Sequence, residues 1–224
     1  MINRLQRGSN MLIDTHLHES KYSTDSHISL IEIVMRAKEI GLDGICITDH
    51  ESNEIMEEAH ELSRKTNFVI LVGAEFLTHE GDMTVFGLDK LPESKIHAHE
   101  LIELVDKKGG VAICSHPFRQ NNRGMGEHIK NLDILWGIEA FNGSTPPHHN
   151  LHAYNLSLDL NVPALGGSDA HNWQQVGKYV TVFPDGISTE KDLIEAIKSK
   201  QVYPAYYENG RYKTIDDYYR QNIL

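Results

Sequence analysis

The chain has 224 residues, of which 40% are hydrophobic and 24% charged, which is typical of one soluble globular domain. Its formal net charge of -11 comes from 21 Lys and Arg against 32 Asp and Glu. This acidic balance argues against a basic groove for a long nucleic acid. No apolar run approaches the roughly 18 residues that span a bilayer, so we expect no membrane partner.

The N-terminal residues and the two cysteines indicate how the chain is organised and where it is located. Residues 1–10 are polar, carry two arginines and lack the apolar core of a secretory signal, so we interpret them as a short leader before one domain at residues 11–224. Cys46 and Cys114 lie in apolar, strand-like runs, which predicts buried free thiols and a cytoplasmic location. The sequence leaves the oligomeric state open.

Short apolar runs alternate with amphipathic stretches along the chain. The apolar runs predict strands at Met11–Asp14, Gly44–Thr48, Phe68–Gly73, Thr84–Leu88, Val111–Ser115, Gly137–Phe141, Val162–Leu165 and Tyr179–Phe183. Apolar residues at helical spacing predict helices at Leu30–Ile40, Glu51–Thr66, His97–Lys108, Asn150–Leu160 and Thr189–Ser199. This order indicates parallel strands with crossover helices, in an open sheet or a closed barrel. We expect the tyrosine-rich tail from Gln201 to pack against the domain.

The first apolar run leads into the motif Asp14-Thr15-His16-Leu17-His18. Side chains alternate between the two faces of an extended strand, so Asp14, His16 and His18 point the same way. Two imidazoles and a carboxylate at a strand end are typical donors of a metal site. Taken alone, the motif is also compatible with one histidine that caps a loop and another in solvent.

Four more predicted strands run into histidine or carboxylate residues. In chain order these residues are Asp49 and His50, Glu75, His116, and Asp169 and His171. Because the carboxyl ends of parallel strands share one face of an α/β protein, we expect these side chains to converge there. Each residue alone could serve as a helix cap or a hydrogen-bonded structural residue. Together they predict a metal site.

These segments resemble the motifs of the PHP (polymerase and histidinol phosphatase) family. The matching pieces, in the family's order, are Asp14-Thr15-His16-Leu17-His18, Thr48-Asp49-His50, Gly73-Ala74-Glu75, Ser115-His116-Pro117 and Gly167-Ser168-Asp169-Ala170-His171. The resemblance implies an α/β fold with one domain, a distorted (β/α)7 TIM-like barrel. It also implies phosphoester hydrolysis at a site that holds two or three divalent ions of Zn, Mn or Fe.

The resemblance further implies how the ligands are divided. The first ion would take His16, His18, Glu75 and Asp169. The second would share Glu75 as a bridge and add His116, and the third would take Asp25, His50 and His171.

Two ligand positions have alternatives. Many family members place a histidine between the glutamate motif and the next strand, where we place Asp82, with His79 as the alternative. A carboxylate there favours a harder ion such as Mn²⁺ or weakens the site. For the third ion, His27 competes with Asp25.

Cationic and amide side chains near these motifs are candidates for substrate contacts. Arg119 lies in the polar loop after His116, and its planar guanidinium suits bidentate binding of phosphate. The further candidates are Arg123, Asn142 and Lys178. Metal ions in such a cluster lower the pKa of bound water and hold phosphoryl oxygens.

Protonation of the leaving group requires an acid near the metals. Asp49 and His171 are the candidates, and the sequence does not separate the acid from the ligand. Asp14 and Asp49 are also candidates for partners that orient ligand histidines, a role that we prefer for Asp14.

Together with the predicted metal site, the resemblance implies an enzyme, a metal-dependent hydrolase of phosphoric ester bonds. Short loops and a single domain favour a small phosphorylated metabolite or nucleotide as substrate. The alternatives are a short-oligonucleotide 3′–5′ exonuclease, a non-phosphate metallohydrolase of a related barrel type, and a non-catalytic metal-binding domain.

Overall fold

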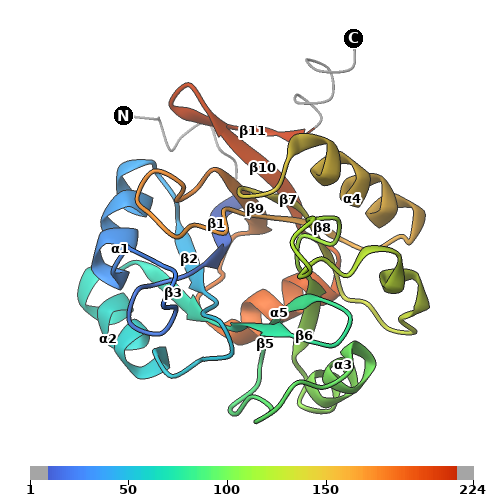
Figure 1. Ribbon diagram of the computed structural model, residues 1–224. Coiled ribbons are helices and arrows are strands. Elements are labelled where there is room, and N and C mark those ends of the chain that lie inside the picture. The colour runs from blue at the N-terminus through green and yellow to red at the C-terminus, as the bar shows by residue number, and fades with distance from the viewer. Residues whose placement is uncertain (1–9, 216–224) are drawn as a thin grey trace.

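A computed structural model describes residues 10–215, in which two β-sheets and five α-helices form a mixed α/β fold (Figure 1). The strands are β1 (Asn10–Leu17), β2 (Gly44–Ile47), β3 (Val69–Val72), β4 (Ala74–Leu77), β5 (Asp82–Phe86), β6 (Val111–Cys114), β7 (Ile138–Asn142), β8 (Ala164–Gly167), β9 (Tyr179–Pro184), β10 (Tyr203–Glu208) and β11 (Arg211–Thr214). The helices are α1 (Leu30–Glu39), α2 (Met56–Thr66), α3 (Ala98–Lys107), α4 (Pro147–Asp159) and α5 (Glu190–Lys198), with a 3-10 helix at Gly126–Asn131. Residues 1–9 of the predicted leader lie outside this range, and Asn10 already belongs to β1.

The two sheets combine parallel and antiparallel pairs. The first has the strand order β11-β10-β9-β1-β2-β3 and the second β4-β5-β6-β7-β8. As predicted, β1, β2 and β3 run parallel, and so do β6, β7 and β8. The prediction is wrong for β5 and β9, which pair antiparallel. Three strands that the sequence did not predict, β4, β10 and β11, also pair antiparallel. Short connections such as Asn209-Gly210 allow hairpins instead of crossovers.

The strands lie around a common centre, with α1 to α4 on the outside (Figure 1). The two sheets approach each other through isolated parallel bridges, Leu17 with Ala170 and His50 with Glu75. The structure therefore confirms the mixed α/β part of the predicted fold. The ladders of residues 10–215 form two sheets and not one closed barrel, so the (β/α)7 arrangement is not confirmed.

An apolar cluster between the two sheets takes side chains from both of them and from α5. Its members include Ile13, Leu71, Ile113, Leu165, Leu193 and Ile197. Because α5 fills this interior, the ligand-type residues lie further along the strands, toward their carboxyl ends. The other helices pack on the strands from outside, α2 on β3, α3 on β6 and α4 on β7.

The α5 helix begins with a capping box. Thr189 Oγ1 accepts a hydrogen bond from the N–H of Asp192 (3.2 Å), and Asp192 Oδ2 accepts one from the N–H of Thr189 (2.9 Å). We expect Thr189→Ala to lower the free energy of unfolding by about 1 kcal/mol, because a helix N–H loses its partner. Urea unfolding measures the change. Lys191→Ala, on the exposed face of the same helix, is the control, and equal stability of Thr189→Ala and the natural chain would contradict the prediction.

The structure also confirms the predictions for the two cysteines and for the tyrosine-rich tail. Cys46 and Cys114 are buried and free. Up to residue 215, the tail packs against the domain as predicted, because β10 pairs with β9 and Tyr206 is buried. None of the helices within residues 10–215 is long and apolar enough to cross a membrane.

Candidate metal centre

Histidine and carboxylate side chains from six strands converge at one place. They come from β1, β4 and β5 and from the residues directly after β1, β2, β6 and β8. Four groups of three have ligand atoms that all lie within 4.8 Å of one another: His16, His18 and Glu75; His16, His116 and Asp169; Glu75, Asp82 and His116; and His18, His50 and His171. The convergence matches the prediction. Glu75 follows the end of β3 as predicted, but it also lies inside a further strand, β4, because the chain changes sheets at Gly73.

The first predicted ligand set is assembled and buried. His16 Nε2 lies 3.0 Å from His18 Nε2 and 3.4 Å from Glu75 Oε1. Asp169 Oδ1 lies 3.2 Å from His18 Nε2 and 3.7 Å from His16 Nε2. None of these four side chains is more than 1% exposed. Two imidazoles and two carboxylates therefore face one another out of contact with solvent.

Glu75 also takes part in a second group. Its Oε1 lies 2.8 Å from His116 Nε2, and Asp82 Oδ2 lies 3.7 Å from the same nitrogen. Asp82 is fully buried, and its Oδ1 has no hydrogen-bond partner among the described residues. Arg123 Nε donates a hydrogen bond to the other oxygen of Asp82, at 2.6 Å. The second group therefore contains two carboxylates, one imidazole and a neighbouring guanidinium.

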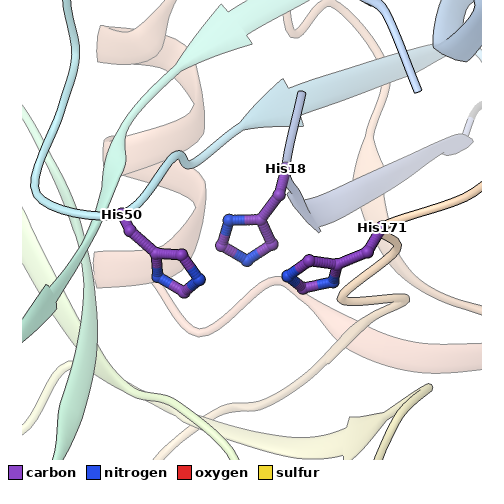
Figure 2. A group of neighbouring side chains, drawn as sticks. All are labelled: His18, His50 and His171. Carbon is purple, nitrogen blue, oxygen red and sulfur yellow. The ribbon is translucent and has the colours of Figure 1, made fainter. Parts of the chain in front are cut away.

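Three imidazoles form the third group, and they point toward one another (Figure 2). The ring centroid of His18 lies 4.3 Å from that of His50 and 4.4 Å from that of His171. Asp25 Oδ2 lies 3.2 Å from His50 Nε2 and 3.3 Å from His171 Nε2. Asp25 is 56% exposed, so it approaches the imidazoles from the solvent side. The structure brings Asp25, His50 and His171 together as predicted, and His18 joins them.

The two alternative ligands lie elsewhere. His79 is exposed, and its ring centroid lies 4.6 Å from that of His97. His27 is exposed, and its backbone N–H donates to the carbonyl oxygen of His171. The geometry therefore favours Asp82 over His79 and Asp25 over His27 as members of the groups.

The electrostatics of the first group suit a cation. Burial lowers the pKa of His18 to about 4, so its imidazole is neutral. Burial raises the pKa of Glu75 and Asp169, but neighbouring histidines, above all His16, hold both well below their usual values. Against burial, Glu139 and the other carboxylates hold the pKa of His16 well above its usual value. Ionised carboxylates with imidazole nitrogens are the donor set of Zn²⁺, Mn²⁺ and Fe²⁺, so these residues fit a divalent ion.

The backbone is strained at two of these residues. His116 has a φ of 29° and Asp169 a φ of 50°, in a left-handed region that non-glycine residues rarely adopt. Gly167 lets β8 approach β1 closely, since a Cβ there would lie 2.5 Å from the Cβ of His16. The close approach brings Asp169 to the histidines of β1.

Glu139 is a residue of the centre that the sequence analysis missed. Its Oε1 lies 2.9 Å from His16 Nδ1, and its Oε2 accepts a hydrogen bond from the backbone N–H of His116, at 3.1 Å. Only 3% of Glu139 is exposed. The available signal was a glutamate inside the apolar run Gly137–Phe141, where a charge without a partner would be costly.

Asn142 and Arg119 form a network on one side of the centre. Asn142 is fully buried, and its Nδ2 donates to Glu139 Oε2 (3.0 Å) and Asp169 Oδ2 (3.3 Å). Arg119 Nη2 donates to Asp169 Oδ2 and to Asn142 Oδ1, and Arg119 Nε donates to Thr145 Oγ1 at 3.2 Å. Arg119 is 16% exposed, so the guanidinium reaches from the centre toward the surface.

Lys178, the remaining candidate for a substrate contact, lies beside this network. Its Nζ donates to the carbonyl oxygen of Gly143, directly after Asn142. The ammonium group is therefore held by the backbone of the loop that follows β7.

Asp14 lies behind the ligand-bearing backbone. Its Oδ1 accepts hydrogen bonds from the backbone N–H groups of Ser168 (2.9 Å) and His16 (3.4 Å), and its Oδ2 accepts one from Gly177 (2.9 Å). Burial raises the pKa of Asp14 to about 6. This geometry fits the role preferred for Asp14, with the difference that it orients the main chain and not an imidazole ring.

The hydroxyl group of Ser23 lies between Asp49 and His18. Asp49 Oδ1 accepts a hydrogen bond from Ser23 Oγ at 2.8 Å, and the same Ser23 oxygen lies 3.3 Å from His18 Nδ1. Asp49 Oδ1 also accepts a hydrogen bond from the backbone N–H of Glu19. Burial raises the pKa of Asp49 to about 7. This position favours a role in orienting His18.

The chain matches two family models. The PHP domain model covers residues 14–116, and a PHP-associated model covers residues 147–202. Three residues of the first ligand set, His16, His18 and Glu75, lie inside the first of these ranges, and Asp169 lies inside the second.

Known proteins resemble the chain in sequence and in fold. The uncharacterized protein MJ1587 of Methanocaldococcus jannaschii is 30% identical over 165 residues, which are 69% of this chain and 94% of that protein. The crystal structure of PsfC from Pseudomonas syringae has a TM-score of 0.71 at 18% identity and covers 96% of this chain and 100% of that one. A two-domain protein from Bacteroides vulgatus, which contains a predicted PHP-like metal-dependent phosphoesterase, has a TM-score of 0.71 at 20% identity, with 88% and 64% coverage. The structural likenesses show a shared fold.

Proposed function

Since this chain belongs to the PHP family, we propose that it is a metal-dependent hydrolase of phosphoric esters. The observation that carries the proposal is the convergence of His16, His18, Glu75 and Asp169 in one buried group. Ionised carboxylates such as Glu75 and Asp169 are costly to bury without a cation beside them. A small phosphorylated metabolite or nucleotide is the proposed substrate, without a long nucleic acid or a membrane as partner, and the proposed location is the cytoplasm.

The described residues would hold two or three divalent ions of Zn, Mn or Fe. The proposed ligands are His16, His18, Glu75 and Asp169 for the first, Glu75, Asp82 and His116 for the second, and Asp25, His50 and His171 for the third. When bound, such ions lower the pKa of water and neutralise charge on phosphoryl oxygens. Glu75 would be shared between sites, because its two oxygens face different histidines.

Residues at the edge of the centre would bind and orient the ester. Arg119 is the proposed phosphate ligand, because its guanidinium is partly exposed and already fixed against Asn142 and Asp169. Fixed donors of this kind stabilise charge that develops in the transition state. Lys178 and Arg123 are secondary candidates. Asn142 would act on the substrate through Arg119, since its own side chain is fully buried.

Where the centre holds only the first two ions, His171 is the proposed proton donor to the leaving group, because a third ion would occupy its imidazole. The His171 side chain is 24% exposed, in contrast to the buried histidines of the first group. Asp49, the other candidate, would orient His18 through Ser23.

An activity screen tests the proposed function. Protein freed of metal with a chelator is reconstituted with Mn²⁺, Zn²⁺ or Fe²⁺ and offered phosphomonoesters, nucleoside bisphosphates, a phosphodiester and a short oligonucleotide. Hydrolysis of a small phosphomonoester or bisphosphate supports the proposal, and cleavage of the oligonucleotide alone favours the exonuclease alternative. Absence of hydrolysis with every ester and every metal contradicts the proposal.

Glu139→Gln is expected to weaken metal binding by about 10- to 100-fold, the usual cost when a partner of a ligand histidine is changed. The amide keeps the shape of the side chain but removes the charge that faces His16 Nδ1. Isothermal titration of metal-free protein with Mn²⁺ measures the affinity. Glu103→Gln, an exposed change on α3, is the matched control, and equal affinities of Glu139→Gln and the control would contradict this role.

A further inference from the structure

Arg123 is tied to Asp82 through both its backbone and its side chain. The carbonyl oxygen of Arg123 accepts a hydrogen bond from the N–H of Asp82 (2.8 Å), and Arg123 Nε donates to Asp82 Oδ2 (2.6 Å). The loop of Arg123 packs tightly on the turn between β4 and β5, since a Cβ at Gly81 would lie 2.5 Å from Met125 N and 2.9 Å from the Arg123 carbonyl oxygen. The position of the guanidinium is therefore set by the fold of the loop.

The guanidinium lies among the donors of the second and third ligand groups. Arg123 Nη2 is 3.7 Å from Glu75 Oε2 and 3.2 Å from His50 Nδ1. The Arg123 side chain is 30% exposed, whereas Glu75 is 1% and Asp82 0% exposed. At such distances in a partly buried site, a fixed positive charge stabilises the two carboxylates and repels a further cation.

A divalent ion would use the same two carboxylates. Glu75 and Asp82 form a group with His116 whose ligand atoms lie within 4.8 Å of one another. The second oxygen of Asp82 is buried and has no hydrogen-bond partner in the part of the chain that the structure describes. The guanidinium of Arg123 and a metal ion therefore compete for the carboxylate of Asp82.

We propose that Arg123 is a built-in competitor of the second metal ion and sets the affinity of the group formed by Glu75, Asp82 and His116. The inference rests on the proposed metal centre and adds a residue that controls how many ions it holds. At low metal concentration the guanidinium neutralises Asp82. Binding of an ion through Asp82 Oδ2, the oxygen that faces His116, requires the guanidinium to leave that oxygen.

Metal titration of the full chain tests the inference. Chelator-treated protein is titrated with Mn²⁺ by calorimetry, and bound Mn²⁺ is counted by elemental analysis after gel filtration. We compare the natural chain, Arg123→Gln, the double variant Arg123→Gln/Asp82→Asn, and Arg211→Gln, which removes an exposed arginine on the edge strand β11. Arg123→Met repeats the test should the glutamine variant fail to fold, which thermal unfolding detects.

Arg123→Gln is expected to bind its weakest Mn²⁺ at least tenfold more tightly than the natural chain, or to retain one more ion per chain. The Arg211→Gln control should bind as the natural chain does, and the double variant should lose the gain. Three results would each overturn the inference: unchanged binding by Arg123→Gln, an equal gain in the control, or a gain that persists in the double variant.

Ester hydrolysis is measured separately on the same proteins. A gain in Mn²⁺ affinity without hydrolysis of any ester leaves this inference intact and contradicts the proposed function. Hydrolysis of an ester without a gain in Mn²⁺ affinity supports the proposed function and contradicts this inference.

Discussion

Glu75→Gln is expected to lower kcat/KM for ester hydrolysis by more than about a hundredfold, because a change in a mere partner of a ligand already costs about 10- to 100-fold. The carboxylate of Glu75 lies 3.4 Å from His16 Nε2, 3.0 Å from His50 Nδ1 and 2.8 Å from His116 Nε2. Among the carboxylates of the centre, Glu75 therefore lies close to the largest number of histidine side chains. Steady-state kinetics measures this fall in kcat/KM, and elemental analysis measures the loss of bound metal that we expect with it.

The control for Glu75→Gln is Glu103→Gln, which changes the same residue type on the exposed face of α3. It should keep full activity and full metal content. A Glu75→Gln protein that is folded and binds metal as the natural chain does would contradict the central position given to this carboxylate.

Arg119→Ala is expected to lower kcat/KM for phosphate esters by about a hundredfold, the usual cost of removing one fixed donor from a charged transition state. The loss should spare a non-phosphate ester, because the guanidinium is proposed to bind phosphoryl oxygens. Comparison of the two substrate classes under the same metal conditions measures it.

Two controls accompany Arg119→Ala. Arg119→Lys keeps the charge without the planar fork and should recover part of the activity. Metal content distinguishes loss of substrate binding from damage to Asp169, whose carboxylate accepts a hydrogen bond from Arg119. Undiminished turnover of phosphate esters by the alanine variant would refute the proposed role and favour a non-phosphate substrate.

The predictions from sequence succeeded where the pattern is local. Within residues 10–215, the apolar runs and the helical spacing identified the five α-helices and most strands to within about five residues. They missed the hairpin of β10 and β11, although Asn209 and Gly210 carry the Asn-Gly signal of a tight turn and have φ values of 51° and 80°. They also missed β4, because nothing in the sequence indicates that the chain changes sheets at Gly73 and forms a second strand directly after the predicted one at Phe68–Gly73.

The candidate site was predictable because its donors follow strand ends. The spacing of His16 and His18 indicates a shared face, and the position of Asp169 after an apolar run indicates the same rim. The partners of these donors depend on which strands are neighbours. Glu139 reaches His16 only because β7 lies beside β8 and β8 approaches β1, and no local pattern contains that arrangement.

Reconstitution of the metal-free protein is the most direct test of a metal-dependent hydrolase. Chelator-treated protein is assayed on the panel of phosphate esters before and after addition of Mn²⁺, Zn²⁺ or Fe²⁺, with bound metal counted in parallel. We predict no turnover without metal, turnover of at least one small phosphate ester after reconstitution, and at least two ions per chain at saturation. Equal turnover with and without metal, or no hydrolysis of any ester by protein that carries its full complement of metal, would contradict the account.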